Sequence, residues 1–76
     1  MNEVTFDFLD KIHLEQWEKA LFLKSVIIDK NTVHLPRRLK VFAASGTYTC
    51  EVLGSVFDFI KSQLEKQGKT VSIIEP

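Results

Sequence analysis

The chain opens with alternating apolar and polar residues and then changes to a helical spacing. Over residues 3–9, apolar residues at the even positions are separated by polar ones, which predicts a strand with one buried face. From about residue 12 to residue 24, apolar residues recur every three or four positions, which predicts an amphipathic helix. Asp10 is a candidate N-cap, because a short carboxylate accepts hydrogen bonds from the first backbone N–H groups of a helix. Phe22 and Leu23 lie off the apolar stripe and favour an early end to this helix.

The middle of the chain is rich in β-branched residues that are interrupted by turn-forming ones. Residues 25–35 contain two apolar runs around Asp29-Lys30-Asn31, which predicts either a tight hairpin or one long, interrupted strand. Pro36 ends this segment, because it has no N–H to donate to a neighbouring strand. Residues 39–44 predict another strand, and residues 45–49 predict a loop.

The strongest helical pattern covers residues 50–67. Its apolar residues form a wide arc, which is typical of a helix that packs on a sheet. Gly68 predicts the end of this helix, since glycine adopts the left-handed conformation without a Cβ clash. Residues 71–74 then predict a last strand.

The predicted order is strand, helix, strand or hairpin, strand, helix, strand. This order fits the α+β class, and specifically a ferredoxin-like βαββαβ plait with two helices on one face of a mostly antiparallel sheet. A small three-layer α/β domain is the alternative. Prolines and glycines are scattered and no linker or repeat occurs, so we expect a single domain over residues 1–76.

The composition excludes several classes of protein. Ten basic and ten acidic residues give a formal net charge of zero, which is not typical of a strongly basic nucleic-acid binder. A hydrophobic content of 45% excludes a disordered chain. One cysteine and two separated histidines give no disulfide framework and no metal-ligand spacing, so we expect no metal and no other cofactor. No apolar run approaches about 18 residues and the start of the chain is acidic, so we expect neither a membrane span nor a signal peptide, but a cytoplasmic protein.

Two helices cover only one face of the predicted sheet, yet the opposite face is not polar. If Val41 faces the helices, Phe42 faces away from them, and the same argument leaves apolar residues outside on the neighbouring strands. Exposed apolar surfaces usually mark contact with another protein. We therefore predict a surface that binds a protein partner or a second copy of the chain, formed by Ile27, Phe42 and Ile74 with Arg37 and Arg38 at its rim. In the opposing interpretation Phe22, Leu23 or the 30–38 loop folds over this surface.

The predicted loop between residues 45 and 49 leads into the N-terminus of a predicted helix. Backbone N–H groups and the helix dipole attract anions at such a place. Hydroxyl groups and a glycine add to a candidate anion site made of Ser45, Gly46, Thr47 and Thr49. The spacing of a P-loop or of a dinucleotide fingerprint is absent, and ordinary helix capping by Thr47 or Thr49 explains the same residues.

Cys50 falls in the first turn of the predicted helix, where the dipole favours the thiolate and makes a reactive thiol conceivable. A lone cysteine is more often a small buried hydrophobic residue. No histidine lies near it in the sequence, and no pair of carboxylates or nucleophile–base pattern suggests catalysis. We therefore expect a protein that is not an enzyme.

Charge is uneven along the chain although it sums to zero. Residues 3–18 hold five acids and one lysine, whereas residues 19–40 hold six bases and one acid. The cluster Arg37-Arg38-x-Lys40 is able to contact phosphates, and Phe42 is a candidate for base stacking. The ribonucleoprotein signature is absent, and a solvated loop explains the cluster equally well.

The stretch from Lys40 to Pro76 resembles the strand–helix–strand unit of STAS domains, especially in its ending from Lys66 to Ile74. The Asp-Ser-Ser-Gly loop of that family is absent, and Cys50-Glu51-Val52-Leu53 stand in its place. The first 39 residues do not follow the family's order of elements, so the resemblance assigns no family.

The sequence thus predicts a small interaction or regulatory domain that self-associates or binds a protein through an apolar sheet face. One alternative is a domain that binds a phosphate or nucleotide at residues 45–49. The other is a nucleic-acid binder that uses the basic residues 37–40.

Overall fold

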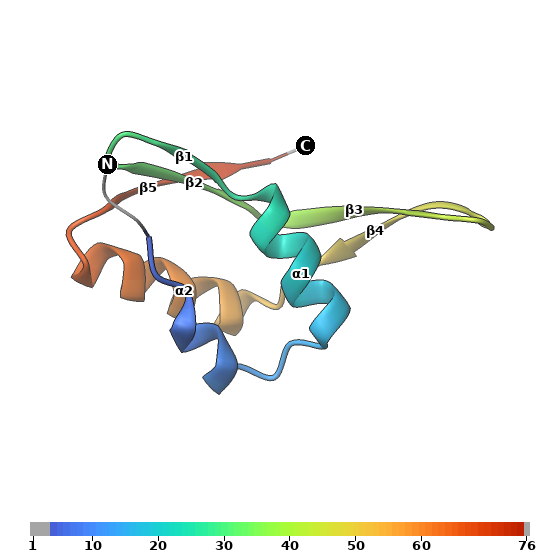
Figure 1. Cartoon of the computed structure of the whole chain (residues 1–76), viewed down its shortest axis with the longest axis horizontal. Helices are drawn as coiled ribbons and strands as arrows, with labels where there is room; N and C mark the ends of the chain where they lie inside the picture. The colour runs from blue at the N-terminus through green and yellow to red at the C-terminus, as the bar shows by residue number, and fades with distance from the viewer. Residues whose placement is uncertain (1–3, 76) are drawn as a thin grey trace.

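The strands form two sheets that meet end to end, and the helices lie on one side of both (Figure 1). The computed structural model describes residues 4–75 of the chain. In chain order the elements are the 3-10 helix η1 (Asp7–Lys11), α1 (Gln16–Ser25), β1 (Ile27–Asp29), β2 (Thr32–Pro36), β3 (Arg38–Ala43), β4 (Gly46–Glu51), α2 (Gly54–Lys66) and β5 (Thr70–Ile74). Two α-helices with two small sheets confirm the predicted α+β class.

The ferredoxin-like order is not confirmed. A βαββαβ plait places its strands in one sheet, whereas here β1, β2 and β5 form one sheet and β3 and β4 form another. The described chain also begins with η1, where the plait needs a strand. The helices do not sandwich the sheets as a three-layer α/β domain requires, because they lie together on one side (Figure 1).

β2 is the central strand of the larger sheet. It pairs antiparallel with β1 through a tight turn at Lys30, whose φ of 54° is left-handed, and it pairs in parallel with β5. The hairpin expected within residues 25–35 is therefore confirmed, and the single interrupted strand is not. As predicted, Pro36 is the last residue of this segment.

The two sheets are joined through the backbone of Arg37. Its N–H donates to the carbonyl oxygen of Ile74 at 3.2 Å, and its carbonyl oxygen accepts from the N–H of Val52 at 3.1 Å. Both groups point to the same side of the strand, so β5 and β4 lie on the same edge of the continuous β2–β3 segment, one after the other. The chain therefore passes from the first sheet into the second through a single residue, Arg37, at which it bends.

A hydrophobic core fills the space between the sheets and the helices. Its fully buried side chains come from α1, β2 and α2, and are Phe22, Val33, Leu35, Phe57, Ile60 and Leu64. The hairpin of β3 and β4 projects beyond this core, which accounts for overall dimensions of 40 × 24 × 20 Å (Figure 1). Within residues 4–75, no helix is long and apolar enough to cross a membrane.

The predicted strand over residues 3–9 is wrong for the residues that the structure describes; Glu3 lies outside them. Residues 7–11 form η1, in which the N–H of Leu9 donates to the carbonyl oxygen of Phe6 at 2.9 Å. Phe8 and Leu9 are both buried. A strand with one covered face buries only one of two consecutive side chains, whereas a helical turn packs both into the core.

The first predicted helix starts later and ends later than expected. α1 begins at Gln16 and runs to Ser25, and Asp10 is not its cap but forms an exposed ion pair with Lys19 at 3.5 Å. Phe22 is fully buried, so the expectation of an early end is wrong. The buried face of this short helix is centred on Phe22 rather than on the stripe that the spacing suggested.

Residues 45–49 are not a loop before a helix. Gly46–Glu51 form β4, which pairs with β3 across a turn at Ala44 and Ser45, and α2 starts only at Gly54. The run Thr47-Tyr48-Thr49-Cys50 has strong β-propensity, and tertiary pairing with β3 decides the outcome. The predicted end of α2 is confirmed, since Gly68 has a φ of 81° and its N–H donates to the carbonyl oxygen of Glu65 at 3.0 Å.

Candidate interaction surface

The side of the strands that faces away from the helices forms one continuous surface, here called the outer face. In β2 and β3 the odd-numbered residues from Val33 to Val41 point toward the helices, and the even-numbered residues point away. Arg37 forms a bend between the two strands, and the alternation of accessible and buried residues resumes in β3. The outer face therefore runs from the larger sheet onto the hairpin. Its accessible members on the two strands are Thr32, His34, Arg38, Lys40 and Phe42, whereas Pro36 is buried.

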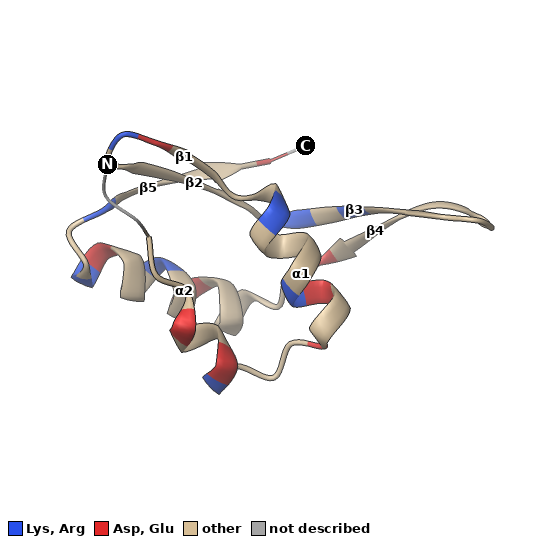
Figure 2. Cartoon of the chain, in the orientation of Figure 1, with Lys and Arg blue, Asp and Glu red and all other residues tan. Residues whose placement is uncertain are grey.

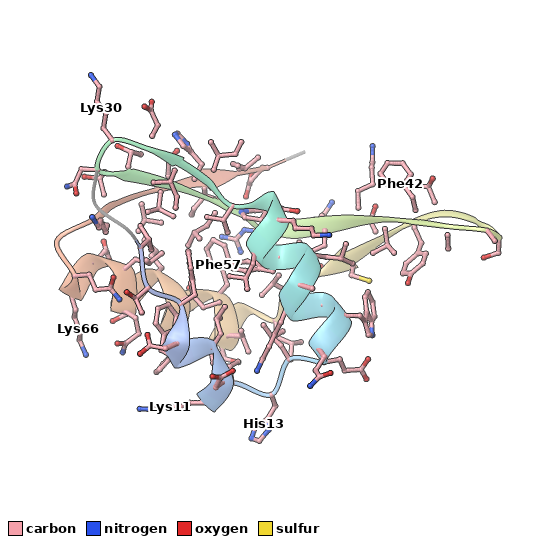
Figure 3. All side chains as sticks on the ribbon, in the orientation of Figure 1. Lys11, His13, Lys30, Phe42, Phe57 and Lys66 are labelled. Carbon is pink, nitrogen blue, oxygen red and sulfur yellow. The ribbon has the colours of Figure 1, made fainter. Side chains whose placement is uncertain are left out.

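Phe42 is the most exposed large hydrophobic side chain of the described residues. It keeps 77% of its surface exposed, and it projects from β3 on the side opposite the helices (Figure 3). Its cross-strand neighbour is Thr47, which is also exposed. The expectation that Phe42 faces outward is confirmed, and neither Phe22 nor Leu23 of α1 folds over it, because α1 packs on the opposite side.

Ile27 and Ile74 belong to the outer face of the larger sheet. Ile27 is 57% exposed and lies opposite His34, which in turn pairs with Ser72. Ile74 pairs with Pro36 and is half-buried. Ile27 is therefore exposed as expected, whereas Ile74 is only partly accessible and its partner Pro36 is buried.

The three apolar residues do not form a single patch. His34 and Phe42 are eight residues apart on the same continuous segment, about 26 Å at roughly 3.3 Å per residue. Arg38 and Lys40 lie between them on the outer face, and both are exposed. The outer face thus has an apolar region at each end and a basic region in the middle.

Arg37 does not lie at the rim of this surface. Its guanidinium carbon lies 4.7 Å from the centre of the buried Phe57 ring, on the helix side of the sheets. Its Nε is 3.3 Å from Glu75 Oε1, an ion pair without hydrogen-bond geometry. Arg37 therefore stabilises the junction of the two sheets, whereas Arg38 alone of the pair is presented outward.

The candidate anion-binding residues lie on the exposed hairpin. Ser45 is in the turn, Gly46 follows with a φ of 132°, and Thr47 and Thr49 belong to the outer face of β4. None of them precedes the first turn of a helix, because α2 begins at Gly54. The anion site was expected from a helix N-terminus that the structure does not place there.

Cys50 is likewise on β4 and not in a helix. It pairs with Leu39, is half-buried, and packs against the hydrophobic core. It therefore lacks the helix dipole on which the hypothesis of a reactive thiol depended. Among residues 4–75, no group of three His, Cys, Asp or Glu side chains is arranged to hold a metal ion.

Charge is mixed on the helix side of the molecule and basic along β3 (Figure 2). Acidic residues on η1 and near the start of α1 lie beside lysines of the same helices, whereas the charged residues of β3 are Arg38 and Lys40. The outer face of β3 is therefore basic, and the helix side has charges of both signs.

The sequence did not reveal an aromatic pair on the inner side of the hairpin. Trp17 of α1 and Tyr48 of β4 meet edge to face with ring centres 6.4 Å apart, and each remains at least 40% exposed. Trp17 Nε1 also donates to a carboxylate oxygen of Glu15 at 2.6 Å. Tyr48 was assigned to a loop, so no alternation signalled that its side chain would return to α1.

Comparisons of the chain with protein-family models, with curated proteins and with solved structures found no match.

Proposed function

We propose that the chain is a non-enzymatic interaction or regulatory domain that binds a protein, either a second copy or another partner, through its outer face. The observation that carries this proposal is Phe42, with 77% of its surface exposed on a side of the sheets that none of the helices within residues 4–75 covers. A phenylalanine in water loses about 1.5–3 kcal/mol relative to a buried one, so its position favours a role in contact with another molecule. Ile27 repeats the same feature at the other end of the face.

The test compares two exposed apolar residues on different sides of the molecule. Phe42→Ser removes the apolar group of the outer face, and Leu53→Ser is the matched control, since Leu53 is 67% exposed but precedes α2. Sedimentation equilibrium over a wide concentration range measures self-association of each variant. We expect Phe42→Ser to weaken it about 10- to 100-fold, the effect of about 1.5–3 kcal/mol.

Equal association of the wild-type chain, Phe42→Ser and Leu53→Ser would contradict binding through the outer face. A wild-type chain that stays monomeric at all concentrations would contradict self-association through it. In that case the proposal is that the outer face binds a different protein, and the binding of that protein to Phe42→Ser and Leu53→Ser tests it.

The same face favours nucleic acid as a second candidate. Arg38, Lys40 and Phe42 occupy every second position of β3 and so lie on the same side of an exposed two-stranded ribbon. A ribbon of two strands fits the major groove of DNA. Exposed aromatic residues also stack on unpaired bases. Binding should then weaken steeply between 50 and 200 mM salt and be lost when Arg38 and Lys40 are both changed to Gln, whereas salt-independent or absent binding would exclude it.

A further inference from the structure

The free edge of β4 has little of the protection that prevents strand edges from pairing with another chain. Within residues 4–75, β4 pairs only with β3, so its other edge has no strand beside it. Exposed edges are usually protected by charged side chains, proline or bulges. Residues 46–50 are Gly, Thr, Tyr, Thr and Cys, without a charge or a proline, and the one charged residue of β4 is Glu51 at its end.

The register shows which backbone groups are available at this edge. The N–H of Val52 donates to Arg37, and antiparallel strands alternate between residues that face the partner and residues that face away. Cys50 and Tyr48 therefore direct their N–H and C=O groups toward β3. Thr47 and Thr49 direct their N–H and C=O groups toward the free edge of β4, and their side chains are exposed as well.

The segment is also symmetric about Tyr48. Thr47 and Thr49 flank it, and the smaller Gly46 and Cys50 follow on either side. If two copies pair antiparallel about this residue, Thr47 of each copy forms a hydrogen-bonded pair with Thr49 of the other. The two Tyr48 side chains are then direct neighbours, each beside its half-exposed Trp17, and no like charges face one another across the pair.

We infer that β4 pairs antiparallel with β4 of a second copy, centred on Tyr48, and that this pairing joins the two hairpins into a four-stranded sheet. The inference goes beyond the proposed function, because it adds a contact between two copies at the strand edge that is separate from the contact made by the outer face. A two-stranded hairpin is only marginally stable by itself, and two added strands supply the missing hydrogen bonds.

The edge of β5 is the competing site. Thr70–Ile74 are also uncharged, and β5 is an outer strand of its sheet. However, β5 is less exposed along its length than β4. Pairing about its central residue would bring two copies of Ser72 together.

Disulfide trapping distinguishes these sites. Tyr48→Cys and Ser72→Cys are each made in a Cys50→Ser background and oxidised mildly at low concentration. Directly opposed residues in a non-hydrogen-bonded antiparallel pair have Cα atoms about 4.5 Å apart, which a disulfide spans. We expect a covalent dimer for Tyr48→Cys and little for Ser72→Cys; the reverse result, or no dimer in either, overturns the inference.

A backbone test separates edge pairing from contact through the outer face. Thr49→Pro removes an N–H that points to the free edge of β4, and edge strands tolerate proline at such positions. Thr49→Val is the control, because valine has a similar shape and keeps the N–H. We expect self-association to weaken at least 10-fold with Pro and less than 3-fold with Val, while Phe42→Ser leaves the Tyr48→Cys dimer intact. Equal association of the Pro and Val variants overturns the inference. Loss of the Tyr48→Cys dimer with Phe42→Ser also overturns it, because the outer face then makes the contact.

Discussion

The larger sheet and the β3–β4 hairpin are built from similar strands but depend on different neighbours. In the larger sheet, Val33 and Leu35 are fully buried between the central strand and the helices. In the hairpin, every residue of β4 except Cys50 is exposed, and α1 covers the inner side only near Tyr48. The comparison shows that stability is concentrated in the body of the molecule and that the surface offered to other molecules is concentrated on the hairpin.

The largest difference should appear when one aromatic residue is truncated in each region. Phe57→Ala removes a buried ring at the centre of the core and should lower the free energy of unfolding by about 3–5 kcal/mol. Phe42→Ala should change it by less than about 0.5 kcal/mol, because its ring is exposed. Urea unfolding followed by circular dichroism measures both values. Similar losses for the two variants would contradict the conclusion that stability is concentrated in the body of the molecule.

Two glycines with positive φ provide a finer comparison. Gly68→Ala should cost about 1–2 kcal/mol, because the left-handed conformation at φ 81° links α2 to β5, which pairs with the central strand β2. Gly46→Ala is strained too, at φ 132°, but the hairpin can open locally without unfolding the core, so its effect on global unfolding should be smaller. Since nothing lies within 4 Å of either added Cβ, packing does not complicate the comparison. A larger loss for Gly46→Ala would show that the hairpin is an integral part of the cooperative unit.

The smallest effect concerns the two neighbouring arginines at the junction. Arg37→Gln removes the stacking on Phe57 and should cost about 0.5–1 kcal/mol of unfolding free energy. Arg38→Gln changes only an exposed side chain of the outer face and should have an effect close to zero. Thermal unfolding of the two variants side by side measures the difference, and equal midpoints would mean that the Arg37 stacking contributes nothing.

Local patterns predicted the parts of the fold in which one signal dominates. The turn at Lys30, the end of α2 at Gly68 and the strand that follows it were found because turn and cap chemistry are local. The outward direction of Ile27 and Phe42 followed from alternation, which a strand imposes whatever it pairs with.

The remaining parts depend on contacts that are distant in the sequence. Residues 4–9 alternate like a strand, but Phe8 and Leu9 are both buried by α2 and its neighbours, and this makes a helical turn the better arrangement. Residues 46–51 become a strand only because β3 lies beside them. No spacing in the sequence shows that Arg37 turns inward onto Phe57, since the ring is twenty residues away along the chain.

The short passage from β2 through the bend at Arg37 into β3 limits how this hairpin can change in length. Because side chains alternate with a period of two, inserting two residues into each strand would lengthen the β3–β4 hairpin and leave Phe42 on the same side. A single extra residue would instead move every side chain beyond the insertion to the opposite face, and Phe42 would then point toward α1. The length of the β3–β4 hairpin should therefore vary among natural sequences in steps of two residues per strand, while Arg37 at the junction is kept.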